Sequence, residues 1–276
     1  VNPQVRWRIA AVLTELADHH SLGALTAALK DFNVSVRKQA ADGLGALGSV
    51  KAASALIKML EDPEERGYTK ARAIRALGAI GARSVAPRLL KILRDKKEDY
   101  SMRHAALYAL WDMRFDIPVK VLRQAIVFGL RADSDTMQPF AAAAAAEFKD
   151  RATAIRRALL KNTRDPNEEV RNVSVYALGE IGDPSPIATL RKRLPAARSG
   201  RLLNNIAFAL YKMGDLKVVS KLGELLKHRQ AVIRLNAAFV LGDTGEKGAV
   251  PLLLGALDDG NDMVRASAVA ALGKIG

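Results

Sequence analysis

The feature that most constrains this sequence is a unit that returns every 31 to 35 residues. Residues 165–182, DPNEEVRNVSVYALGEIG, show it most clearly. The second half of this unit returns as VRKQAADGLGALG, VIRLNAAFVLGDTG and MVRASAVAALGKIG, each ending on a glycine. A unit that recurs at a near-constant interval cannot bury its own apolar face and must stack on its neighbours. The sequence therefore predicts a solenoid.

Each unit contains two segments with apolar residues at helical spacing, as at residues 22–29 and 34–47. The connector between them carries Asp, Asn or Pro, which suits a turn that caps the next helix. The closing glycine suits a left-handed residue past a helix end. We therefore expect one all-α solenoid over residues 1–276, with about eight and a half antiparallel pairs of helix A and helix B. The expected repeat ends are Ala17, Gly48, Gly81, Arg114, Lys149, Gly182, Gly214, Gly245 and Gly276.

These units resemble HEAT repeats, in particular the short HEAT-like class also found in phycobilisome lyases, over essentially the whole chain. The resemblance is carried by Val–Arg followed by Ala–Ala in helix B, by the Leu–Gly–x–Ile–Gly ending, and by a helix A proline at Pro87 and Pro251. It implies a superhelix in which the B helices line the inner, concave surface and the A helices the outer one.

The HEAT pattern also has an Asp six residues before the helix B Arg. The matching pairs are Asp31 with Arg37, Asp165 with Arg171, and Asp259 with Arg265. The resemblance implies a ladder of such pairs that ties turns to helices. The Arg position holds Lys70, Gln138 and Leu203 in three units, where we expect the ladder to be broken.

Helix B offers aromatic residues at one register in four units, with asparagines one turn earlier. Rigid aromatics beside amides on a concave groove would suit a peptide-binding stripe. The alternative is that the aromatics fill the contact between adjacent B helices. The candidate contacts are Tyr108, Asn172, Tyr176, Asn204, Asn205, Phe208, Asn236 and Phe239.

The chain is strongly basic, with a formal net charge of +14, which favours acidic partners such as nucleic acid, an anionic membrane surface or an acidic protein. Cations gather on or near the A helices, where they could track phosphates or form a solvated helix face. The candidates for nucleic-acid binding are Arg156, Arg157, Lys161, Arg191, Lys192 and Arg193.

Catalytic chemistry has little support in this sequence. Cysteine is absent, which excludes disulfides, thiolate nucleophiles and cysteine-ligated metals. No His–Glu dipeptide occurs, so the paired metal motif of a HEAT-repeat hydroxylase that acts on a lysine-derived residue is missing. There is also no Walker-type phosphate loop, and we expect neither a metal nor a cofactor. A phycobilin lyase-like activity would rest on residues that build the solenoid.

An alkylpurine DNA glycosylase is a further enzymatic alternative, because that HEAT-like family uses Trp, Asp and Arg in a basic groove. Trp111, Asp112 and Arg114 give these residue types in one unit, but the second tryptophan, Trp7, lies far along the stack.

Our leading hypothesis is a non-catalytic scaffold that binds a protein or peptide on its concave B-helix surface, with nucleic-acid binding through the basic surface as the rival. No run of residues is apolar enough to span a bilayer, and we expect a cytoplasmic protein. The sequence leaves the partner's identity and the oligomeric state open. Val1 enters in the middle of a unit, and Gly276 ends one with an apolar helix still in need of cover, so we expect a longer natural chain or another chain that covers the ends.

Overall fold

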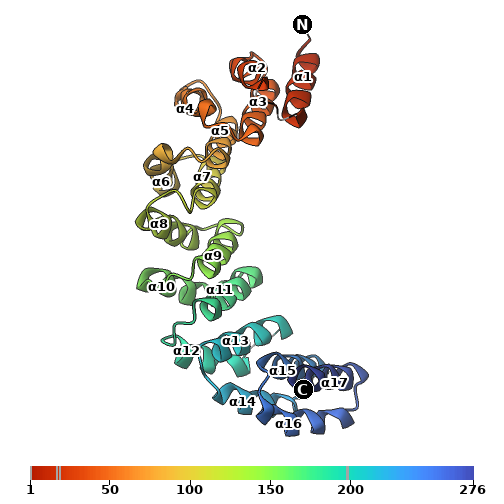
Figure 1. The fold of residues 1–276 in the computed structure, drawn as a ribbon. Coiled ribbons are helices and arrows are strands. Elements are labelled where there is room, and N and C mark those ends of the chain that lie inside the picture. The colour runs from red at the N-terminus through yellow and green to blue at the C-terminus, as the bar shows by residue number, and fades with distance from the viewer. Residues whose placement is uncertain (1, 17, 19, 197–198) are drawn as a thin grey trace. The chain divides into compact units, whose positions relative to one another are not determined.

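The computed structural model describes residues 2–16, 18, 20–196 and 199–276, and this described part is helical, without a β-strand (Figure 1). It divides into two compact units, residues 1–132 and 133–276, each of which is described by itself. The expected repeat end Ala17 lies outside the described residues. None of the described helices is both long and apolar enough to cross a bilayer.

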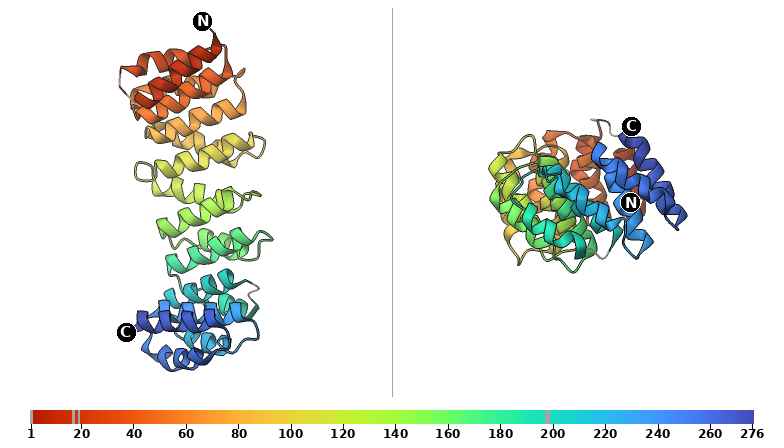
Figure 2. Two further views of the ribbon diagram at one scale, coloured as in Figure 1. Left: turned by 90° about the vertical axis from the view of Figure 1, so that its right-hand side faces the viewer. Right: turned by 90° about the horizontal axis from the view of Figure 1, so that it is seen from below.

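Unit 1 contains α1 and three helix pairs, followed by α8. Within each pair the first helix is helix A and the second is helix B, and consecutive B helices pack side by side (Figure 2). The large side chains that point between the layers, such as Leu44, Leu77 and Leu107, are fully buried. The helices are α1 (Pro3–Leu16), α2 (Ser21–Ala28), α3 (Val34–Leu47), α4 (Ala53–Glu61), α5 (Gly67–Ala79), α6 (Ala86–Arg94), α7 (Tyr100–Asp112) and α8 (Val119–Leu130).

Unit 2 repeats this layout from α9 onward, with α9, α11, α13, α15 and α17 as B helices that contact one another in sequence. The predicted all-α stack of helix pairs is confirmed in both units. The helices are α9 (Met137–Phe148), α10 (Thr153–Asn162), α11 (Glu168–Ile181), α12 (Ile187–Arg193), α13 (Gly200–Lys212), α14 (Lys217–Leu225), α15 (Ala231–Thr244), α16 (Val250–Gly255) and α17 (Asp262–Ile275).

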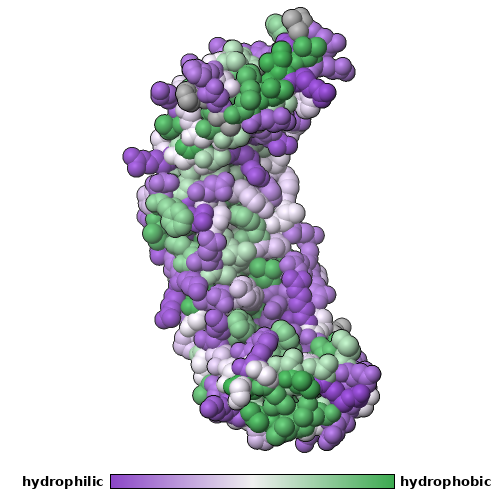
Figure 3. All heavy atoms as spheres, turned by 45° about the vertical axis from the view of Figure 1, so that its right-hand side comes forward, coloured by the Kyte–Doolittle hydropathy of each residue, from purple (hydrophilic) through white to green (hydrophobic). Residues whose placement is uncertain are grey.

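Hydrophobic surface covers α1 in unit 1 and the last helices of unit 2 (Figure 3). On α1 it comes from Val5, Ile9, Val12 and Leu16, which are 48 to 66% exposed. These side chains recur at three and four residues apart, so they form one stripe of the helix. They are exposed because no other described helix of unit 1 covers this stripe.

The ends of the helices follow the sequence prediction. Asn33, Asn167 and Asn261 cap α3, α11 and α17, and each side chain accepts hydrogen bonds from the amides two and three residues later. The closing glycines at 48, 81, 182, 214, 245 and 276 all have φ between 65° and 89°. Lys149 takes the same left-handed conformation with φ of 50°, although it has a Cβ.

At two places in unit 2, adjacent B helices approach so closely that a side chain is excluded three residues before the closing glycine. A Cβ on Gly179 would lie 2.7 Å from the Cα of Ala209, and one on Gly242 would lie 2.6 Å from the Cα of Ala271. Tyr211 occupies this position in α13. Its ring is half-buried, and its hydroxyl donates a hydrogen bond to Glu246 (3.3 Å).

The aspartate–arginine ladder connects repeats in a different way from the one expected. Arg37 donates to the backbone carbonyl of Asp31 (2.8 Å) rather than to its carboxylate, which pairs with Arg6 of the preceding repeat. The same arrangement recurs where Arg234 binds the Asp259 carboxylate through two bonds of 2.6 and 2.8 Å. Each arginine–carboxylate pair, which we call a rung of the ladder, therefore joins one B helix to the turn of the following repeat.

The ladder is weakened rather than broken at Gln138, so that expectation is wrong at this position. The Gln138 amide still donates to the Asp165 carboxylate (3.4 Å). At Lys70 and Leu203 no such rung forms within the described residues, in agreement with the prediction.

Candidate functional site

Three aromatic side chains lie on consecutive B helices of unit 2: Tyr176 on α11, Phe208 on α13 and Phe239 on α15. Tyr176 is 42% exposed and Phe239 is 45% exposed, whereas Phe208 is half-buried. The rings of Tyr176 and Phe208 are stacked, with centroids 6.4 Å apart and an interplanar angle of 7°. We call these three residues the aromatic stripe. Each ring therefore has apolar area in contact with solvent, and two of the rings support each other across helices.

Two lysines flank the aromatic stripe. The Nζ of Lys212 lies 5.3 Å from the centre of the Phe208 ring, and the Nζ of Lys274 lies 4.5 Å from the centre of the Phe239 ring. Carboxylates hold both lysines, since Lys212 lies 3.5 Å from Glu180 and Lys274 lies 2.6 Å from Asp243. The cations thus rest on ring faces. Asp243 pairs with Lys274, whereas Lys212 shares Glu180 with Lys149, which lies 3.4 Å from that carboxylate.

The asparagines beside the stripe connect helices to one another. Asn172 is fully buried, so the expectation that it faces outward is wrong. The Asn205 amide donates to the Asn172 backbone carbonyl (3.3 Å), which joins α13 to α11. The side-chain amides of Asn204 and Asn236 hydrogen-bond at 2.8 Å, which joins α13 to α15. These amides fix the spacing of the helices that carry the aromatic rings.

Tyr108 lies in unit 1 and is not part of the aromatic stripe. Its ring is 4.6 Å from that of His104, and the Arg75 guanidinium lies 5.3 Å from its centre. Burial, together with the charge of Arg75, lowers the pKa of His104. Tyr108 therefore belongs to a separate aromatic and cationic cluster on α5 and α7.

Two of the six basic candidates hold the solenoid together. Arg156 pairs with Asp183, and Arg191 forms two bonds of 2.7 and 3.0 Å with Asp215. Asp183 and Asp215 directly follow closing glycines, so these pairs fasten an A helix to the start of the next repeat. Hydrogen bonds from the hydroxyl and amide of Ser185, assisted by Arg156, lower the pKa of Asp183 to about 2.

The remaining basic candidates differ in their surroundings. Arg157, Lys161 and Lys192 are exposed and form no ion pair within the described part of the chain. Arg193 is half-buried, and burial together with the nearby charge of Arg164 lowers its pKa. Only three of the six cations are thus fully available to a ligand on the surface.

The side chains named for a glycosylase are engaged with one another at the end of α7. The Arg114 guanidinium lies 4.7 Å from the centre of the Trp111 ring and 4.5 Å from that of Phe115. Burial raises the pKa of Asp112. Trp7 lies on α1. Sequence reasoning did not single out Phe115, which is 85% exposed, because it follows the helix and falls outside the repeating pattern.

The chain matches known families and structures along most of its length. A family model for HEAT repeats matches residues 1–68, 124–211, 156–234 and 219–276, and a model for the PBS lyase HEAT-like repeat matches residues 69–95. A deoxyhypusine hydroxylase from Danio rerio is 32% identical over 126 residues, which is 42% of this chain and 39% of that protein.

Solved structures share the fold at low sequence identity. A chain in a structure of Kap95p with RanGDP has a TM-score of 0.70 and 15% identity, over 92% of this chain and 39% of that chain. A chain in a homology model of the full-length AP-3 complex has a TM-score of 0.68 and 12% identity, over 100% of this chain and 55% of that chain.

These similarities agree with the capped helix pairs, the left-handed glycines and the inter-repeat ladder described above. The family model covers well over half of the sequence, including the first half of unit 1 and all of unit 2. The chain belongs to the HEAT-repeat proteins.

Proposed function

We propose that unit 2 acts without catalysis, as a scaffold that binds a segment of a partner protein along the aromatic stripe. The observation that carries the proposal is the alignment of Tyr176, Phe208 and Phe239 on three consecutive B helices, with Tyr176 and Phe239 each more than 40% exposed. Buried aromatic anchors dominate the binding energy of many protein interfaces. Rings that are already held in place lose little conformational freedom when a partner covers them.

The surroundings of the rings favour a partner with apolar side chains. Beside the rings, Glu180 pairs with both Lys149 and Lys212, and Asp243 pairs with Lys274, so most of the charge here is already paired and apolar ring area is what remains for a partner. The inter-helix amides of Asn204, Asn205 and Asn236 keep neighbouring B helices in a fixed register. A segment that places apolar side chains at the same interval could therefore contact successive rings without rearranging the solenoid.

The direct test is partner capture from native extract with the double variant Tyr176→Ala, Phe208→Ala. Each truncation of an aromatic anchor is expected to cost about 2 kcal/mol of binding free energy, so capture should be lost. Phe115→Ala is the matched control, because this aromatic is exposed in unit 1 and lies outside the stripe. Equal helical content by circular dichroism shows that the variants are folded. Undiminished capture by the double variant contradicts the proposal.

Salt dependence separates this proposal from nucleic-acid binding. Contacts with phosphates weaken steeply as ionic strength rises, whereas a partner held mainly by the apolar rings of the stripe should be retained with little change. Retention of duplex DNA at low salt, abolished by charge reversal at Arg157 and Lys161, would move the function to the basic A-helix surface. Arg156 and Arg191 are unsuitable for that test because they are bound to aspartates within the fold.

A further inference from the structure

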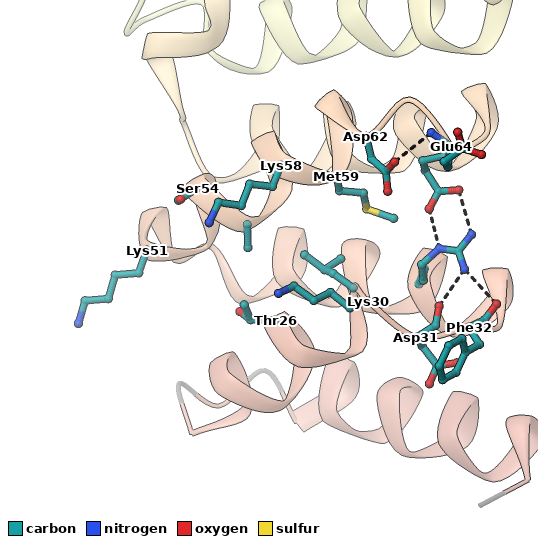
Figure 4. Close-up of a pocket in the computed structure, with 14 residues that line it drawn as sticks. Thr26, Lys30, Asp31, Phe32, Lys51, Ser54, Lys58, Met59, Asp62 and Glu64 are labelled. Atoms are coloured by element: carbon teal, nitrogen blue, oxygen red, sulfur yellow. Dashed lines mark hydrogen bonds and ion pairs between the residues drawn. The ribbon is translucent and has the colours of Figure 1, made fainter.

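A second surface of unit 1 has the features of a binding groove. A cavity of about 720 Å³ opens between the A helices α2 and α4 (Figure 4). Leu29, Ala55 and Met59 form its apolar part. Most of the surface of Leu29 and Met59 is buried in the core, and only a small part faces the cavity. We call this cavity the A-helix groove. It is separate from the aromatic stripe, which lies on B helices of unit 2.

The charged residues of the A-helix groove are segregated along its length. Figure 4 shows Lys30 and Lys58 at one end, close to the hydroxyl-bearing side chains of Thr26 and Ser54. Asp62 and Glu64 lie at the other end, beyond the apolar part. The groove thus offers a cationic end, an apolar middle and an anionic end.

The lysines of the groove are available to a ligand, while several neighbouring charges are not. Lys30 and Lys58 are exposed and form no ion pair within the described residues of unit 1. In contrast, Asp31 is held by Arg6, and Glu65 is held by Arg37. Within the described residues, the groove charges without an ion pair are therefore the lysines, Lys51 included, and, at the other end, Asp62 and Glu64.

The Phe32 side chain supplies a further contact at the anionic end. It lies in the turn after α2, lines the groove and is 100% exposed. In Figure 4 it lies next to Asp31, at the same end of the groove as Asp62 and Glu64, where it could pack on the alkyl stem of a basic side chain.

We propose that the A-helix groove binds a short peptide segment of a partner protein, with an acidic side chain at Lys30 and Lys58, apolar side chains over Leu29 and Met59, and a basic side chain at Glu64. Charge complementarity selects this occupant. A nucleic acid would bring phosphates to the anionic end, and it has no aliphatic groups for the apolar middle.

The test uses an array of immobilised octapeptides in which acidic, leucine or methionine, and basic residues occur in this order, with scrambled sequences of equal composition beside them. Wild-type protein should enrich the ordered peptides over the scrambled ones. In solution, Lys30→Glu with Lys58→Glu should weaken an enriched peptide by about tenfold or more, because attraction becomes repulsion. Glu64→Lys should weaken it as well.

Lys120→Glu with Lys217→Glu is the matched control, since both lysines are exposed and lie outside the groove. It should bind the peptide as wild type does. The variant Tyr176→Ala, Phe208→Ala should also retain the peptide, which separates this inference from the proposed function of unit 2. The inference is overturned if ordered peptides are not enriched, or if the folded Lys30 and Lys58 variant binds them with unchanged affinity.

Discussion

The Arg37–Glu65 rung of the inter-repeat ladder offers a quantitative test of how unit 1 is held together. Two bonds of 2.5 and 3.0 Å join the guanidinium to the carboxylate, and the two side chains are 20% and 4% exposed. Arg37 also donates to the carbonyls of Asp31 and Phe32. Burial alone would raise the pKa of Glu65, but hydrogen bonds from Arg37 and the Arg66 amide outweigh it and lower this pKa.

The two single substitutions should differ in cost. Arg37→Ala leaves a nearly buried carboxylate with few donors and removes two carbonyl contacts, so we expect a loss of about 3 kcal/mol in the free energy of unfolding. Glu65→Ala leaves Arg37 with its carbonyl partners and partial access to water, so we expect about 1.5 kcal/mol. The double variant should cost about as much as Arg37→Ala, which corresponds to a coupling energy of about 1.5 kcal/mol.

Chemical denaturation followed by tryptophan fluorescence measures these differences in unit 1, because Trp7 and Trp111 are the two tryptophans and both lie there. A lowered pKa in the folded state means that the stabilisation by Glu65 is complete above its unfolded-state value of about 4.3. It should be lost as the pH falls through the lower folded value. A coupling energy below about 0.3 kcal/mol at pH 7, or a larger loss from Glu65→Ala than from Arg37→Ala, refutes this reasoning.

Three further predictions concern unit 2. Gly179→Ala should lower the free energy of unfolding by about 1 to 3 kcal/mol, because the new Cβ would clash with Ala209. Gly273→Ala at the same register should instead stabilise α17 by up to about 1 kcal/mol, since nothing lies within 4 Å of the new Cβ. Thermal denaturation of both variants measures this contrast. Lys149→Gly should raise stability by about 1 kcal/mol in urea denaturation, by relieving the left-handed conformation of a residue with a Cβ; lower stability contradicts this. For Asp183→Asn, the loss relative to wild type should be full above pH 4, shrink as the pH falls and vanish near the folded pKa of about 2; a loss independent of pH in acid titrations contradicts this.

The sequence predicted the repeating architecture well because the responsible signals are local. Asn33 and Asn167 cap helices through amides two and three residues away, and glycines such as Gly182 end helices through their own φ. The same local reasoning failed for the ladder. Arg37 and Asp31 are six residues apart, but the carboxylate that Arg37 binds belongs to Glu65 of the following repeat. Pairing across repeats depends on how the helices stack.

The candidate site was only partly predictable for a similar reason. Register alone identified Tyr108, Tyr176, Phe208 and Phe239 as one row, and the structure places the last three on consecutive B helices of unit 2, while Tyr108 lies in unit 1. Register could not show that Asn172 is buried, because its burial results from the close approach of α13. It also could not reveal the A-helix groove, whose walls come from two different repeats.

Site-specific photo-crosslinking tests the central claim of partner binding at the aromatic stripe most directly. A benzophenone amino acid at Phe239, which is 45% exposed, would be irradiated in the presence of the captured partner, with the same group at Phe115 as a control. We predict a crosslink to one defined segment of a partner protein from position 239 and none from position 115. Capture of the partner without a crosslink at position 239 would contradict the assignment of this surface. A crosslink obtained only when the benzophenone replaces Arg157, on the basic surface, would contradict it as well.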